Sequence, residues 1–134
     1  MNAVDTNILI YANDSREPEK RIIAEKVIGE LRDGILLWQV ACEYIAAARK
    51  LERFGFSQSE AFADLKYLSN AWPVIFPNWK VMEKTEELVS GYSISFWDAA
   101  LVAACVENEI ETLYSEDMGD HFRKIGLRII DPFH

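Results

Sequence analysis

The chain has 134 residues, half of them apolar and only 6 Gly and 4 Pro, a composition that excludes disordered, collagen-like and low-complexity proteins. This length suits a single domain, which we predict to span residues 1–134. No apolar stretch approaches the roughly 20 residues that cross a bilayer, and no export signal is visible. The net charge of −8 opposes phosphate binding by the surface as a whole and suits a basic protein partner.

The chain begins with an apolar run, Ala3-Val4, which we predict to be a buried strand. The Asp-Thr-Asn cluster that follows is typical of a helix start, and residues 8–11 then form a short helix. Pro18 occupies the first turn of a second helix, whose apolar residues recur at helical spacing until Gly34.

The next elements follow the same alternation. Residues 35–38 form a strand, and residues 39–54 have the pattern of a helix that ends at Gly55. The Ser57-Gln-Ser-Glu60 sequence has the spacing of a capping box and opens a further helix, with Pro73 just beyond its end.

The second half of the chain contains three more predicted strands. They cover residues 74–76, 112–114 and 128–130. Between them we predict helices at 78–89 and from Ser95 to Val106, and a helical turn or two at 118–124. The helix that starts at Ser95 is apolar nearly all round, so we expect it to be among the most buried.

Short, uniformly apolar strands that alternate with helices indicate an α/β fold, a single-domain parallel sheet of about five strands covered by helices on both faces. Ligands of such sheets bind at the carboxyl ends of the strands. Three acidic residues fall at that edge, because Asp5 follows the first strand, Glu43 lies about one helical turn past the second, and Asp117 follows the fourth. Asp98, in the first turn of the apolar helix, reaches the same edge if the helix approaches from that side.

Four carboxylates gathered in one place repel each other unless a cation compensates them. An all-oxygen set of this kind suits Mg²⁺ or Mn²⁺, ions that keep several waters and bind phosphate oxygens. Such a site activates water and stabilises charge on a phosphodiester, so the pattern favours hydrolysis of a nucleic-acid backbone.

Each acid also has a structural alternative. Ser95 and Asp98 have capping-box spacing, and Asp5 suits a helix cap. Asp117 competes with its acidic neighbours Glu116 and Asp120. Glu43 is harder to explain structurally, because its neighbours leave no polar face around it.

Four segments together resemble the PIN-domain nucleases, especially the VapC-like toxins of bacterial toxin-antitoxin pairs. They are Val-Asp5-Thr-Asn-Ile-Leu-Ile-Tyr, Gln-Val-Ala-Cys-Glu43-Tyr, Ser-Phe-Trp-Asp98-Ala-Ala-Leu-Val-Ala-Ala and Tyr-Ser-Glu-Asp117-Met, in the order of the family. The resemblance spans nearly the whole chain. It implies a PIN-like fold and a Mg²⁺- or Mn²⁺-dependent endoribonuclease in which Asp5, Glu43, Asp98 and Asp117 are the acidic catalytic and metal-binding cluster.

The same resemblance gives supporting roles to Thr6, Asn7 and Ser115. It further implies a homodimer and inhibition by a small antitoxin protein that inserts a segment near the active site. Two residues depart from the family pattern. Trp38 stands where many members of the family have a small polar residue, and Cys42 stands where a larger apolar or polar residue is usual. We expect either change to narrow the substrate groove.

The remaining reactive residues carry weaker signals. Cys42 and Cys105 lie in apolar patterns, which predicts reduced core cysteines of a cytoplasmic protein, and His121 is predicted to be a surface group. Trp72, Trp79, Phe96 and Trp97 suit base stacking or a dimer contact, with core packing expected for at least half of them. Two other functions stay open, namely a phosphatase that uses Asp5 as its nucleophile and a non-catalytic binding module of the same fold.

Overall fold

The computed structural model describes residues 1–134 and contains the predicted parallel sheet, with strand order β3-β2-β1-β4-β5. The strands are β1 (Asn2–Val4), β2 (Gly34–Leu37), β3 (Val74–Ile75), β4 (Thr112–Tyr114) and β5 (Arg128–Ile130). Every neighbouring pair is parallel. The α/β prediction is therefore confirmed, and β1 lies at the centre of the sheet, between β2 and β4.

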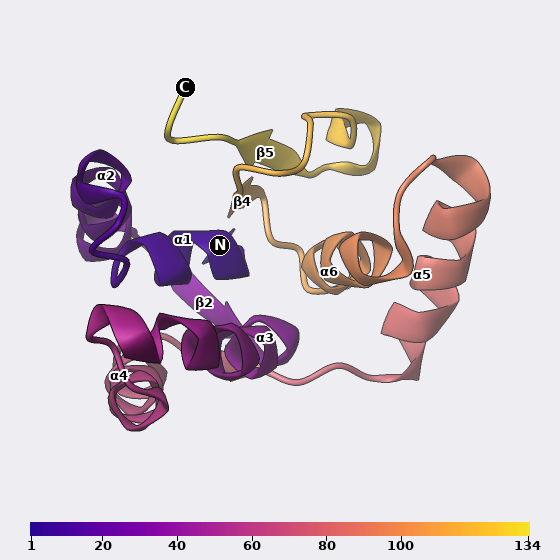
Figure 1. Cartoon of the computed structure of the whole chain (residues 1–134). Coiled ribbons are helices and arrows are strands. Elements are labelled where there is room, and N and C mark those ends of the chain that lie inside the picture. Colours follow the sequence, from indigo (N-terminus) through magenta and orange to yellow (C-terminus); the bar gives the residue numbers. More distant parts are fainter.

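Six α-helices surround this sheet. They are α1 (Thr6–Tyr11), α2 (Pro18–Glu30), α3 (Trp38–Ala48), α4 (Gln58–Ala71), α5 (Trp79–Gly91) and α6 (Phe96–Glu107). Figure 1 shows α1 and α2 on one side of the sheet and α5 and α6 on the other, with α3 and α4 beside β2. Helix α5 packs on α6, and α1 packs on both α2 and α3. No helix is both long and apolar enough to span a membrane.

Two predicted helices are shorter than the sequence suggested. Residues 39–54 are not one helix, because α3 ends at Ala48 and a 3₁₀ segment, η1 (Arg49–Phe54), continues to Gly55 at φ 95°. The tighter 3₁₀ turns keep Leu51 buried while the chain reverses. At 118–124 only the 3₁₀ turn η2 (Arg123–Ile125) forms, because Asp120 accepts the Ile129 N–H and ties this segment to β5.

The core lies on both faces of the sheet, and α6 contributes more buried residues to it than any other helix. Six residues of α6 are buried, as its apolar sequence predicts: Ala99, Leu101, Val102, Ala103, Ala104 and Cys105. On the opposite part of the sheet Trp72 is buried against Gly34, where a Cβ atom would lie 2.6 Å from the indole ring. Gly34 therefore permits a close approach of the indole to β2 that no other residue allows.

Several residues expected in the core are exposed. Of the four aromatics in question only Trp72 is buried, whereas Trp79, Phe96 and Trp97 have exposed fractions of 72%, 44% and 63%. Cys42 is likewise exposed. These side chains line a groove between α3, α5 and α6 that the core does not fill. The expectation that at least half of the four aromatics pack in the core is therefore wrong, as is the core position expected for Cys42, whereas the core position of Cys105 is confirmed.

Candidate active site

The candidate site lies at the carboxyl edge of the sheet, where the chain leaves β1, β2 and β4. Asp5 follows Val4 at the end of β1, and the segment from Ser115 to Asp117 follows β4 next to it. The two segments are joined where the Asp5 N–H donates to the Tyr114 carbonyl at 2.8 Å. Glu43 enters from α3, which begins directly after β2. Parallel strands that share an edge thus bring these residues close together although they are far apart in sequence.

The carboxylate of Asp5 is held from two sides. Its Oδ1 accepts the Thr6 N–H at 2.7 Å, which makes Asp5 the N-cap of α1. Its Oδ2 accepts the hydroxyl of Ser115 at 2.7 Å, and Ser115 is fully buried. Asp5 is therefore a helix cap and a fixed member of the site at once, and the supporting residue Ser115 is in contact with it.

The three acids after β4, Glu116, Asp117 and Asp120, differ in the partners that they contact. Asn7 donates to the carboxylate of Asp117 at 3.1 Å, whereas Glu116 pairs with Lys20 and accepts the hydroxyl of Tyr11. Asp120 pairs with Arg123 in an ion pair of 2.6 Å. Asp117 alone of the three has no basic partner. Its place beside Asn7 makes it the acid available to a cation.

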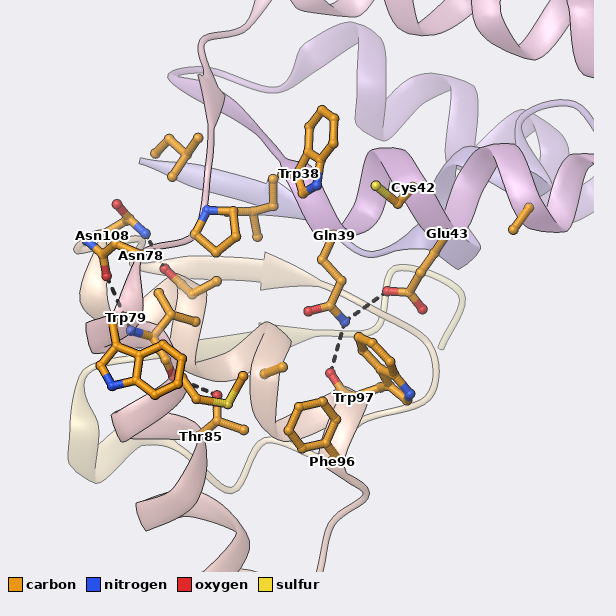
Figure 2. Close-up of a pocket in the computed structure, with 18 residues that line it drawn as sticks. Trp38, Gln39, Cys42, Glu43, Asn78, Trp79, Thr85, Phe96, Trp97 and Asn108 are labelled. Carbon is orange, nitrogen blue, oxygen red and sulfur yellow. Dashed lines mark hydrogen bonds between the residues drawn. The ribbon is translucent and has the colours of Figure 1, made fainter.

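Glu43 and Asp98 are connected by one side chain. Figure 2 shows the amide of Gln39 between Glu43 and the backbone of Trp97. Gln39 Nε2 lies 2.9 Å from Glu43 Oε1 and 3.0 Å from the Trp97 carbonyl oxygen. Gln39 thus holds the N-terminus of α6, and with it Asp98, next to Glu43. Gln39 is not among the predicted site residues, although its i,i+4 spacing to Glu43 is the pattern of a helical side-chain pair.

Only one of the two hydrogen bonds of a capping box forms between Ser95 and Asp98. Ser95 caps α6, because its hydroxyl accepts the Asp98 N–H at 3.2 Å. The reciprocal bond, from the Ser95 N–H to the Asp98 carboxylate, is absent, whereas the box formed by Ser57 and Glu60 is complete. The carboxylate of Asp98 therefore makes no capping hydrogen bond at the start of α6 and is left for another role.

The electrostatics of the site centre on Asp5. Burial raises the pKa of Asp5, the hydrogen bonds from Ser115 and Thr6 oppose this, and the nearby carboxylates Glu43 and Asp98 raise it further. No basic group offsets these carboxylates around Asp5. An uncompensated set of hard oxygen donors fits a divalent cation such as Mg²⁺.

The side chains are not drawn together as closely as ligands of one ion. No group of three or more His, Cys, Asp or Glu side chains lies at such spacing. Glu43 and Asp98 are within electrostatic range of Asp5, and Asp117 is joined to Asp5 through the hydroxyl of Ser115, which accepts the Asp117 N–H at 3.3 Å.

One buried polar atom at this edge has no partner. Thr6 Oγ1, in the first turn of α1 beside Asp5, makes no hydrogen bond. Buried hydroxyls normally find a partner, so this atom offers an oxygen to a ligand at the site.

The fold and this edge can now be compared with known proteins. The sequence model of the PIN domain matches residues 3–126. The chain belongs to the PIN domain family. No curated protein matches its sequence closely enough to add to that assignment.

Solved structures share the fold of this PIN domain over nearly its full length. A toxin-antitoxin complex from Klebsiella pneumoniae is 20% identical, with a TM-score of 0.70 and coverage of 98% of each chain. VapBC-1 from nontypeable Haemophilus influenzae is 21% identical, with a TM-score of 0.66 and coverage of 99% of this chain and 98% of that one. VapC20 from Mycobacterium tuberculosis, described as a sarcin-ricin loop cleaving toxin, is 18% identical, with a TM-score of 0.65 and coverage of 94% and 95%.

Proposed function

We propose that this PIN domain is a Mg²⁺- or Mn²⁺-dependent endoribonuclease and the toxin of a toxin-antitoxin pair. The observation that carries the proposal is the set of carboxylates Asp5, Glu43 and Asp98 at the sheet edge, with no basic group to offset them around Asp5. Family membership supports nuclease chemistry. RNA as the substrate is supported by a protein of the same fold, VapC20, which is described as cleaving the sarcin-ricin loop.

The proposed roles follow from the contacts. Asp5, Glu43, Asp98 and Asp117 would hold the cation, and Ser115, Asn7 and Gln39 orient them through the hydrogen bonds described above. When bound, Mg²⁺ or Mn²⁺ would lower the pKa of a water molecule that it coordinates, and it would place a positive charge beside the phosphate. The cation also lets a chain of net charge −8 receive a polyanion, since the phosphate meets a positive ion at the carboxylates.

The proposal is tested with purified protein and a structured RNA. We expect cleavage in Mg²⁺ or Mn²⁺, none in excess chelator, and recovery when the metal is restored, because the carboxylates alone repel the phosphate. Gel electrophoresis of end-labelled RNA measures the cleavage, and a DNA of the same sequence is the matched substrate control. Cleavage that continues unchanged in chelator contradicts the metal requirement.

We propose that the antitoxin is a small basic protein. The net charge of −8 favours a partner of opposite charge, and two of the structures that share this fold are toxin-antitoxin complexes. A basic segment near Asp5 would compensate the same carboxylates that the cation does, so partner and metal would compete for one site.

We further propose that the chain forms a homodimer through the groove between α3, α5 and α6. The groove holds about 760 Å³, and Glu43, at its edge, is the only charged residue among those that line it. Four exposed aromatic side chains line it, namely Trp38, Trp79, Phe96 and Trp97, and Phe76 packs on Trp38. An apolar surface without a basic residue suits a second copy of the same surface better than the phosphates of RNA.

Trp79→Glu should weaken self-association at least about tenfold, because losing a central aromatic typically costs about 2 kcal/mol or more at an interface. Trp79 is 72% exposed on this face, whereas Tyr67, on α4, is 73% exposed outside the groove. Tyr67→Glu is therefore the matched control and should leave the dimer intact. Sedimentation velocity over a range of concentrations measures both, and a wild-type protein that stays monomeric contradicts the proposal.

A further inference from the structure

Three consecutive residues after β4 face three different partners. The hydroxyl of Ser115 donates to Asp5, and the carboxylate of Asp117 accepts from Asn7. The carboxylate of Glu116, between them, is turned away from both. It lies against α1 and α2, where it accepts the hydroxyl of Tyr11 at 2.5 Å and pairs with Lys20. The loop therefore places two of its side chains in the site and a third, of the same charge as Asp117, outside it.

Lys20 forms the ion pair that holds Glu116 in this position, and His134, at the end of the chain, adds a weaker attraction. Its ammonium group also donates to the Tyr11 hydroxyl at 3.2 Å and lies 4.6 Å from the centre of the Tyr11 ring. Phe133 packs edge-on against Tyr11 and covers the ammonium at 5.6 Å. The pair is thus partly shielded from water, with exposed fractions of 30% for Lys20 and 16% for Glu116. A shielded pair with this many partners has one geometry, unlike an ion pair at the surface.

The position of Glu116 is passed on to the site through Asn7. The Glu116 N–H donates to Asn7 Oδ1 at 3.4 Å, and the amide of the same Asn7 side chain donates to Asp117 at 3.1 Å. The side chain of Asn7 therefore forms hydrogen bonds with two successive residues of the loop, Glu116 and Asp117. Without Lys20, the half-buried carboxylate of Glu116 would keep only the Tyr11 hydroxyl and the weaker attraction of His134. We expect it to move, and the backbone that carries Asp117 to move with it.

We propose that Lys20 is a positioning residue of the active site, which fixes the loop at 115–117 by holding Glu116 outside the acidic cluster. Lys20 touches no reacting group, and it acts through Glu116 and Asn7 on Asp117. The inference rests on the proposed ribonuclease function for its effect on activity, but not for its effect on the geometry of the loop.

The first test is kinetic. Lys20→Met should lower kcat for RNA cleavage roughly tenfold or more, since small displacements of a reacting group have effects of this size. KM should change by less than about twofold, because binding of the RNA is not altered. Arg21→Met is the matched control. Arg21 lies on the same helix in an exposed ion pair with Glu25, and its replacement removes the same charge. The double variant Lys20→Met with Glu116→Gln should regain most of kcat, because no unpaired carboxylate remains.

The second test needs neither metal nor RNA. In metal-free protein, the nuclear magnetic resonance signals of the Asn7 side-chain amide and of the Asp117 backbone N–H should shift in Lys20→Met, stay in place in Arg21→Met and return in the double variant. If Lys20→Met does not fold, Lys20→Gln replaces it with the same expectations. Signals that do not move, or that fail to return in the double variant, overturn the proposal, as does a kcat equal to that of Arg21→Met.

The two tests separate the proposals. If neither wild type nor Arg21→Met cleaves RNA in Mg²⁺ or Mn²⁺, the proposed function fails, and the resonance signals still decide the role of Lys20.

Discussion

Asp98→Asn should lower RNA cleavage about 100-fold or more while the protein stays folded. The carboxylate of Asp98 does not complete the cap of α6, which depends on the hydroxyl of Ser95 and the Asp98 N–H. Asparagine keeps that N–H and the size of the side chain, but it removes a negative charge from the group around Asp5. The loss of activity would then come from weaker metal binding.

Cleavage rates as a function of Mg²⁺ concentration measure this effect, with thermal unfolding as the check on the fold. Glu107→Gln is the matched control, because Glu107 lies at the exposed end of the same helix and its loss changes the net charge equally. Wild-type rates in Asp98→Asn at every Mg²⁺ concentration would remove Asp98 from the site. An unfolded Asp98→Asn alongside a folded Glu107→Gln would instead give Asp98 a structural role.

Asp5→Asn should abolish cleavage and yet make the metal-free protein more stable near pH 7. Burial raises the pKa of Asp5, with Glu43 and Asp98 adding to the shift, so folding opposes the charged form. An acid whose folded pKa lies above its unfolded value of about 3.8 gives stability at low pH, which is lost as the pH rises through the folded pKa. Asparagine has no such loss, and it caps α1 as well as aspartate does.

Thermal unfolding in chelator from pH 4 to pH 7 measures this difference, and we expect Tm to rise by about 4 °C for each kcal/mol gained. Asp14→Asn should do the opposite. Asp14 is buried, and hydrogen bonds from Arg16 lower its pKa, so its contribution is present at pH 7 and is lost as the pH falls. Added Mg²⁺ should stabilise wild type more than Asp5→Asn. A less stable Asp5→Asn at pH 7 would mean that its hydrogen bonds outweigh the repulsion.

The acidic site and the acidic chain pose the same electrostatic problem. The net charge of −8 repels a polyanion, and within the site Glu43 and Asp98 repel Asp5. A divalent cation or a basic segment of a partner protein relieves both at once. The two proposed states, active with metal and inhibited by a partner, are therefore alternative ways to compensate one group of carboxylates.

The sequence by itself determined the elements and their order. Short apolar runs separated by helical patterns predicted the five parallel strands, and local cap signals at Ser57 and Ser95 located two helix starts. Such signals are contained in a few neighbouring residues, so no tertiary information is needed to find them. The strand ends then placed Asp5, Glu43 and Asp117 at one edge, because parallel strands all end on the same side.

The tertiary structure alone decided which side chains meet. On α5, Met82 and Val89 continue the apolar pattern of Val81 and Leu88, yet both are more than 40% exposed, because α5 packs on α6 through a narrower face formed by Val81, Thr85 and Leu88. Nothing in the sequence distinguishes the roles of the adjacent acids Glu116 and Asp117. Lys20 binds one and Asn7 the other, from helices that reach the loop only in the folded chain. Periodicity fixes which residues share a face, whereas partners distant in sequence fix what that face contacts.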